Sequence, residues 1–150
     1  MARILAACGG FLLAVLWMDL MFDVQARRIG SGTGRGEDVL GSIARYYRRV
    51  TTDAFPMNRL IGTVMALTVV GSIYQAIRAP EGCWLLALSP LLCGAPIGLA
   101  AFRVVPNAVR LGARATSIES QTDLARAIFR DHVVCFLAIG VFVATQLWVC

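Results

Sequence analysis

Three adjacent residues, Arg130, Asp131 and His132, carry the side chains best suited to chemistry near neutral pH. His132 is the only histidine in the chain, and imidazole is the side chain that most easily exchanges a proton in this range. Either Asp131 or Asp19 would orient its ring, and an arginine would stabilise an anion formed beside it. The sequence does not decide which aspartate meets His132. The triplet precedes an apolar run, residues 133–149, whose length suits a membrane span.

Two carboxylates, Asp19 and Asp23, stand at the end of the first apolar run, residues 4–22. Their spacing of four places them on one helical face, one turn apart. A carboxylate inside a span costs about 2.5 to 3.5 kcal/mol on insertion scales, so Asp19 needs a partner or water. Asp19 is therefore a candidate catalytic residue, although a buried structural role fits it equally, and Asp23 fits an interfacial position.

The composition indicates a membrane protein. Hydrophobic residues make up 58% of the 150 residues and the mean hydropathy is +0.71, which exceeds what a soluble core needs. All 14 basic residues are arginines, and with 9 acidic residues they give a net charge of +5. In a membrane protein such an excess mostly sets orientation and contacts anionic head groups of the bilayer. The arginines are divided among loops, so nucleic acid is not an expected partner.

No metal or other cofactor is expected from the residue spacing. The 5 cysteines are an odd number without a C-x-x-C pair, which argues against a redox motif or a zinc site. There is no Glu-x-x-His pair and no second histidine, although two aspartates and His132 could in principle supply three ligands. Acid and base chemistry suits these residues better than metal chemistry.

The expected architecture is an all-α, four-helix transmembrane bundle in a single domain, with spans at residues 4–22, 60–77, 83–105 and 133–149. Pro56 should break the chain before the second span, because the residue before a proline is biased away from helix. The third span contains Pro90 and Pro96 and should kink or unwind locally.

The connection between the first two spans, residues 24–56, contains a predicted glycine-rich linker at 30–36 and then a predicted amphipathic helix. Glu37 and Asp38 can open that helix, and its apolar stripe includes Tyr46 and Tyr47. The stripe suits a helix lying in the membrane interface. It suits equally a lid over the end of the bundle, and the sequence does not separate these alternatives.

Arginine counting predicts the orientation in the cell membrane. Twelve arginines lie in or beside the connections 24–59 and 106–130, whereas only Arg3 and Arg78 lie on the opposite side. Both long connections are therefore expected in the cytoplasm, with both termini outside. The polar ends of all four spans then converge at the cytoplasmic end, where a pocket would form. The substrate-binding candidates around it are Trp17, Asn58, Arg59, Arg103 and Asn107.

Several short motifs, in order along nearly the whole chain, resemble the four-helix membrane domain family that includes the anthrone oxygenases. They are a first span, the segment Phe55-Pro56-Met57-Asn58, a Val-Pro-Asn sequence ending at Asn107, and the pair Asp131-His132. The resemblance implies oxidation of a phenolic or other small apolar compound by molecular oxygen without metal or flavin. It implies that Asn58, Asn107 and His132 line the substrate pocket and that His132 removes a proton.

Two other classes of function stay open. The chain can be a non-catalytic membrane subunit or a small-molecule binding or assembly protein, whose small-residue helix faces pack against a partner or a second copy. It can also be a small transporter with Asp19 as a proton or cation site, although no inverted repeat is visible between its halves.

Overall fold

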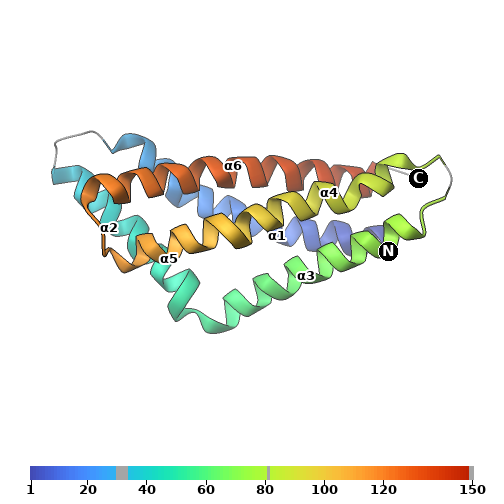
Figure 1. Cartoon of the computed structure of the whole chain (residues 1–150), viewed down its shortest axis with the longest axis horizontal. Helices are drawn as coiled ribbons and strands as arrows, with labels where there is room; N and C mark the ends of the chain where they lie inside the picture. The colour runs from blue at the N-terminus through green and yellow to red at the C-terminus, as the bar shows by residue number, and fades with distance from the viewer. Residues whose placement is uncertain (30–33, 81, 149–150) are drawn as a thin grey trace.

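The computed structural model describes residues 1–29, 34–80 and 82–148, and every element in these ranges is a helix (Figure 1). The elements in order are α1 (Ala2–Asp23), η1 (Val24–Arg28), α2 (Gly34–Arg48), η2 (Arg49–Asp53), α3 (Phe55–Ile77), α4 (Trp84–Leu99), η3 (Ala100–Val104), α5 (Val105–Ala113) and α6 (Ile118–Trp148). Four stretches of this part of the chain are long and apolar enough to cross a membrane: Ala2–Arg27, Phe55–Ile77, Trp84–Ala113 and Ile118–Trp148. The expected all-α architecture with four helices that could span a membrane is thereby confirmed.

The second span begins five residues earlier than predicted. Pro56 was expected to break the chain, but it lies in the first turn of α3, which starts at Phe55. The missing amide hydrogen of a proline costs nothing there, because the first helical amides have no partner within the helix. The predicted linker also changes: α2 already begins at Gly34, and positions 30–33 fall outside the described residues.

In the third span the backbone hydrogen-bonding pattern changes close to the prolines, as the sequence predicted. Pro90 and Pro96 both lie inside α4, and the α-helical pattern gives way to the π-helical turn η3 at Ala100 before α5 continues the same line (Figure 1). A proline removes one backbone donor and displaces the carbonyl one turn earlier. The carbonyl of Pro96 accepts a hydrogen bond from the thiol of Cys135, at 3.5 Å from oxygen to sulfur, in addition to one from the backbone N–H of Ala100.

The bundle itself is asymmetric. Helix α6 packs along both α1 and α4, whereas α3 packs on α1 and α4 from the other side and then diverges from the others toward the end where α2 lies (Figure 1). Gly9 allows α1 to approach α6 closely, because a Cβ there would lie 2.5 Å from a methyl group of Val143. Large apolar side chains such as Val70, Leu91 and Leu137 are exposed on the outside, as contact with lipid requires.

One end of the bundle extends beyond the hydrocarbon core of a bilayer. Helix α6 has 31 residues and is therefore about 46 Å long, against a hydrocarbon core of about 30 Å. Its first turns, together with α5, project beside α2, and both chain termini lie at the opposite end (Figure 1). We call residues 34–53, which form α2 and η2, the cap.

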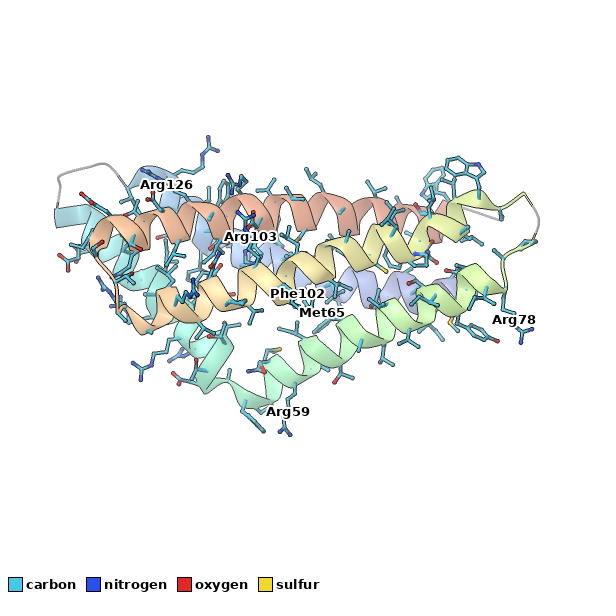
Figure 2. The ribbon with its side chains drawn as sticks, in the orientation of Figure 1. Arg59, Met65, Arg78, Phe102, Arg103 and Arg126 are labelled. Carbon is cyan, nitrogen blue, oxygen red and sulfur yellow. The ribbon has the colours of Figure 1, made fainter. Side chains whose placement is uncertain are left out.

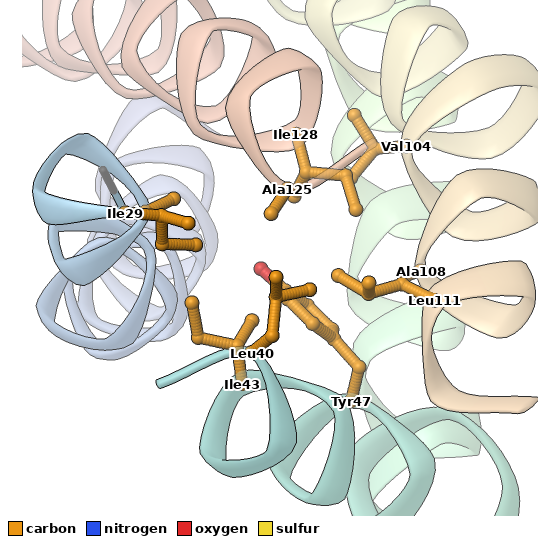
Figure 3. Packing of buried hydrophobic residues seen from close by; sticks show 10 residues of the cluster. Ile29, Leu40, Ile43, Tyr47, Val104, Ala108, Leu111, Ala125 and Ile128 are labelled. Carbon is orange, nitrogen blue, oxygen red and sulfur yellow. The ribbon is translucent and has the colours of Figure 1, made fainter. Parts of the chain in front are cut away.

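The cap has its own apolar core. Leu40, Ile43 and Tyr47 of α2 are almost completely buried, and they pack against Leu111 of α5 and Ile128 of α6 (Figure 3). The apolar stripe that the sequence predicted is therefore covered by protein, which is the lid arrangement. Contact of α2 with the membrane interface is not confirmed.

We expect Ile43→Ala to lower the free energy of unfolding by about 2 to 5 kcal/mol, because Ile43 is fully buried in the cap core. Denaturant titration of the detergent-solubilised protein, followed by circular dichroism, measures the change. Arg45→Ala, at an exposed position of the same helix, is the control and should change the stability by less than about 0.5 kcal/mol. Equal effects of the two substitutions would show that α2 does not pack as described.

Candidate functional site

Buried polar side chains from three helices meet where α1, α2 and α6 come together. The imidazole Nδ1 of His132 lies 2.6 Å from Oδ2 of Asp23, and the hydroxyl of Tyr47 donates to Oδ1 of the same carboxylate at 2.5 Å. The same hydroxyl lies 3.4 Å from the imidazole Nδ1. Asp23 thus holds His132 on one side and Tyr47 on the other.

A second carboxylate completes the group. Oδ2 of Asp19 lies 3.8 Å from Nε2 of His132, and Oδ1 accepts a hydrogen bond from the hydroxyl of Tyr46 at 2.6 Å. We call Asp19, Asp23, Tyr46, Tyr47 and His132 the carboxylate-histidine cluster. In it, each carboxylate has its own tyrosine, and the two imidazole nitrogens face different carboxylates.

The local structure explains why these side chains meet. Asp19 and Asp23 are one turn apart on α1, so both project toward α6. Tyr46 and Tyr47 are adjacent on α2, and the hydroxyl of each reaches one carboxylate. The ring of Phe22 stacks on Tyr46, with centroids 4.0 Å apart. Tyr47 extends from α2 into the centre of the cap core, with its hydroxyl away from the α2 backbone (Figure 3).

Because the side chains of this cluster are buried, they depend on one another for hydrogen bonds. The exposed fractions are 0% for Asp23, 5% for His132 and 8% for Asp19. A buried carboxylate without hydrogen-bond donors is strongly unfavourable, so removing one donor costs more than the bond itself contributes. Burial, followed by the negative charges of the nearby carboxylates, also raises the pKa of Tyr46 and Tyr47 above the ordinary value of 10.0. Both hydroxyls therefore stay protonated as donors.

A cavity of about 400 Å³ lies directly beside the cluster. Asp19, Tyr47 and His132 contribute to its wall at the cap end, and Thr51 and Asn58 add two further polar side chains. The rest of the wall is apolar, from α1, α3, α6 and the α4-η3-α5 line: Leu12, Val15, Leu16, Ile61, Met65, Ile97, Ala100, Val104 and Ile139 are among its residues. An apolar chamber with a few polar groups at one end is the usual form of a small-molecule site.

Asp131, which the sequence offered as a partner of His132, lies elsewhere. Its Oδ2 is 2.8 Å from Nε of Arg103, an ion pair between η3 and α6, and its Oδ1 is 3.7 Å from Nε of its neighbour Arg130 on α6. The Arg103 contact lacks the alignment of a hydrogen bond. Figure 2 shows Arg103 between the α4-α5 line and α6. Asp131 and Arg103 thus tie two helices together and do not line the cavity.

The other predicted binding residues are divided. Asn58 lines the cavity and donates from Nδ2 to the carbonyl of Thr51 at 2.9 Å. Arg59 points away from the bundle (Figure 2) and lies over the ring of Phe55, 3.9 Å from its centroid. Trp17 is 57% exposed and contacts the ring of Phe136. Arg59, Trp17 and Asn107 are not among the residues that line the cavity.

Sequence reasoning did not assign Asp23, Tyr46 and Tyr47 to the site. For Asp23 the signal was present in its spacing of four from Asp19, which put both carboxylates on one face. For the tyrosines, the signal in the sequence was their position on an otherwise apolar helical stripe, where a buried hydroxyl needs a hydrogen-bond partner. Which partner they reach depends on α2 folding back over α1, and this is a tertiary feature.

In the described part of the chain, no group of three or more His, Cys, Asp and Glu side chains has a geometry that could hold a metal ion. Cys135 is a buried free thiol in the cavity wall, and its hydrogen bond to the Pro96 carbonyl gives it a structural role. What the cluster offers chemically is proton exchange at the imidazole.

We expect the hydroxyls of Tyr46 and Tyr47 to stay protonated in the folded protein at pH values where an ordinary tyrosine ionises, since burial raises the pKa of both above 10.0. In the unfolded chain they ionise near their ordinary pKa. The stability that they contribute is therefore complete below about pH 10 and is lost progressively as the pH rises further. Tyrosinate absorbance of the folded protein, compared with that of Tyr46→Phe/Tyr47→Phe, measures this. A smaller alkaline absorbance change in the double variant would contradict the burial of these hydroxyls.

Comparisons with protein-family models, with curated proteins and with solved structures found no match to this chain.

Proposed function

We propose that the protein is a membrane enzyme that removes a proton from a small, apolar, phenol-like substrate and lets the resulting anion react with molecular oxygen. The observation that carries the proposal is the position of His132, whose imidazole is held by Asp23 on one side and lines a largely apolar cavity. The resemblance of the chain to anthrone oxygenases suggests oxygen as the co-reactant.

The geometry assigns different tasks to the two imidazole nitrogens. In the neutral ring, Nδ1 carries the proton that is donated to Asp23, so the lone pair is on Nε2. Asp23 thereby selects the tautomer and stabilises the imidazolium that forms when Nε2 accepts a proton. Nε2 is the nitrogen nearer Asp19, and Asp19 also lines the cavity. A substrate hydroxyl or acidic C–H that lies in the cavity within reach of Nε2, beside Asp19, meets the base directly.

The cavity suits the body of such a substrate. Its volume of about 400 Å³ lies in the range of small-molecule pockets, and apolar side chains from four helices form most of its wall. Burial in this apolar chamber stabilises a ring system, while the polar groups at the cap end orient one acidic group. Exclusion of water also strengthens the interaction of a developing anion with the imidazolium.

The overall reaction balances without another reductant. The activated CH₂ group loses a proton to His132, and the carbanion bonds to one atom of O₂, which becomes a hydroperoxide after it takes up a proton. Loss of the remaining C–H proton and cleavage of the O–O bond then yield a ketone and water. One oxygen atom ends in the carbonyl and the other in water, and the electrons come from the substrate alone.

We expect His132→Gln and Asp23→Asn each to lower the rate of oxygen uptake with an anthrone-like phenol by about 10² to 10⁴-fold. In Asp23→Asn the amide would donate to Nδ1 and hold the ring in the wrong tautomer, so the protein folds but Nε2 is no longer a base. The assay is oxygen consumption by the detergent-purified protein, with metal analysis of the same sample.

Arg78→Gln is the control, because Arg78 lies at the opposite end of the bundle (Figure 2) and should leave the rate unchanged. Wild-type uptake that is equally fast in both site variants would reject general-base catalysis by His132. If the wild-type protein consumes no oxygen with any phenol and elutes with a second membrane protein, the role of a non-catalytic subunit replaces the proposal.

The proposed orientation places the cap in the cytoplasm of a cell membrane. The arginine-rich connections flank the cap end, and the turn after α3, with Arg78, lies at the other end beside the termini (Figure 1). We expect green fluorescent protein fused after residue 114 to fluoresce in cells, and alkaline phosphatase fused after residue 79 to be active. The reverse pattern of activities would invert the orientation.

A further inference from the structure

The opening of the cavity can be located from the exposure of its wall. Among the described lining residues, the exposed ones are Asn58 and Gly62 of α3, Ala101 of η3 and Val105 of α5. Lining residues from α1 and α6 are buried or half-buried. The opening therefore lies between α3 and the η3-α5 segment. This is the region in which α3 diverges from the other helices (Figure 1).

The cap closes the cavity from the water side. Tyr47, Val50 and Thr51 of the cap line the cavity at its polar end. The hydrogen bond from Asn58 Nδ2 to the Thr51 carbonyl joins the end of the cap to the first turn of α3. The cap core packs α2 onto α5 and α6, so there is protein between the imidazole and the aqueous phase. A substrate would have to displace the cap to enter by this side.

Large apolar side chains are exposed beside the opening on both of its sides, together with the polar Asn58 and Thr63 and the charged Arg59 and Arg103. Leu60 and Leu67 of α3 are exposed by 47% and 58%, and Phe102 of η3 is exposed by 87%. Such side chains belong in the hydrocarbon region of a bilayer. Helix α3 has 23 residues and is about 35 Å long, so it roughly spans that region, and Gly62 lies about 10 Å from its start. The opening therefore faces lipid acyl chains.

We infer that the substrate enters the cavity sideways from the bilayer, through a portal formed by Gly62 of α3 and Ala101 of η3. This inference rests on the proposed function for the acidic group of the ligand, and it identifies the ligand as a membrane-dissolved phenol. The hydroxyl end reaches Asp19 and His132, and an alkyl substituent can extend through the portal into the lipid.

The small side chains at the portal determine how wide a ligand can pass. A Cβ added at Gly62 would meet no atom within 4 Å, so a larger residue there fits the fold and narrows the opening. Ala101 stands on the π-helical turn η3, and such turns are frequent at functional sites. Gly62 and Ala101 are thus positions at which substrate width can be changed without touching the carboxylate-histidine cluster.

The test uses 4-hexadecylphenol carrying a diazirine beside the ring, with the protein in lipid nanodiscs. This probe stays in the bilayer, and its tail is too long for a cavity of about 400 Å³. After illumination, mass spectrometry quantifies the labelled peptides of α6 around His132. We expect labelling of the wild-type protein, and about tenfold less in Gly62→Trp and in Ala101→Trp.

Two neighbouring substitutions are the matched controls. Thr63→Trp and Phe102→Trp place the same side chain next to the portal on exposed residues that do not line the cavity, and they should label as the wild type does. A water-confined competitor, 4-hydroxybenzenesulfonate, should not reduce the labelling. Equal labelling of the portal and control variants, or effective competition by the sulfonate, would overturn lateral entry.

The inference of lateral entry and the proposed reaction can be disproved independently of each other. If the wild-type protein is labelled through the portal but consumes no oxygen, lateral entry stands and the oxygenase proposal fails. If oxygen uptake depends on His132 while Gly62→Trp and Ala101→Trp react and label as the wild type does, the reaction stands and lateral entry fails.

Discussion

The buried pair of carboxylates on α1 is the constraint on which the rest of the structure depends. Asp19 and Asp23 lie in a helix that is otherwise apolar enough to cross a membrane, and neither reaches water freely. A helix with two unpartnered carboxylates at this depth would insert poorly. The partners come from two other parts of the chain, since His132 lies on α6 and the tyrosines lie on α2. The need of Asp19 and Asp23 for hydrogen-bond partners therefore determines both the packing of α1 on α6 and the position of the cap.

This constraint also links the stability of the cap to the chemistry of the site. The same Tyr47 hydroxyl that donates to Asp23 lines the cavity, and the same cap residues that bury it close the cavity from water. A buried polar network of this kind is favourable only when every member has its partners. The site is therefore preorganised before any substrate enters: the carboxylate that orients His132 is already held by a second donor. The cap also closes the water side of the cavity, and the route of access that we propose is therefore the gap where α3 diverges.

Much of the fold could be predicted from the sequence, because a bilayer leaves few alternatives to apolar helices of about 20 residues. Four spans, the helix between the first two, and the gathering of polar ends near the cap follow from hydropathy, periodicity and connection length. The start of the second span was placed too late, because Pro56 fits the first turn of a helix as well as it fits a break. To decide between a lid and an interfacial helix, one must know which surface the apolar stripe of α2 contacts. The periodicity of the sequence does not give this information.

The site was predictable only in part, for a related physical reason. His132 and Asp19 are unusual enough in their segments to be identified from the sequence, and the structure brings them within 3.8 Å. Asp131 was the nearest carboxylate along the chain, but consecutive helical residues point in different directions, and Asp131 faces Arg103 instead. The true orienting partner, Asp23, is 109 positions away in sequence. The arginines and Trp17 illustrate the same limit, since residues that end a span together need not face the same side of their helices.

The role of His132 can be tested at a single side chain, because it is the only histidine in the protein. Selective ¹⁵N labelling of histidine therefore gives one imidazole in the NMR spectrum of the protein in nanodiscs. We expect that Nδ1 carries a proton hydrogen-bonded to Asp23 with and without ligand, and that a membrane-dissolved 4-alkylphenol shifts the resonance of Nε2. An unprotonated Nδ1, or an Nε2 resonance that does not respond to the phenol, would contradict the assignment of His132 as the base that faces the substrate.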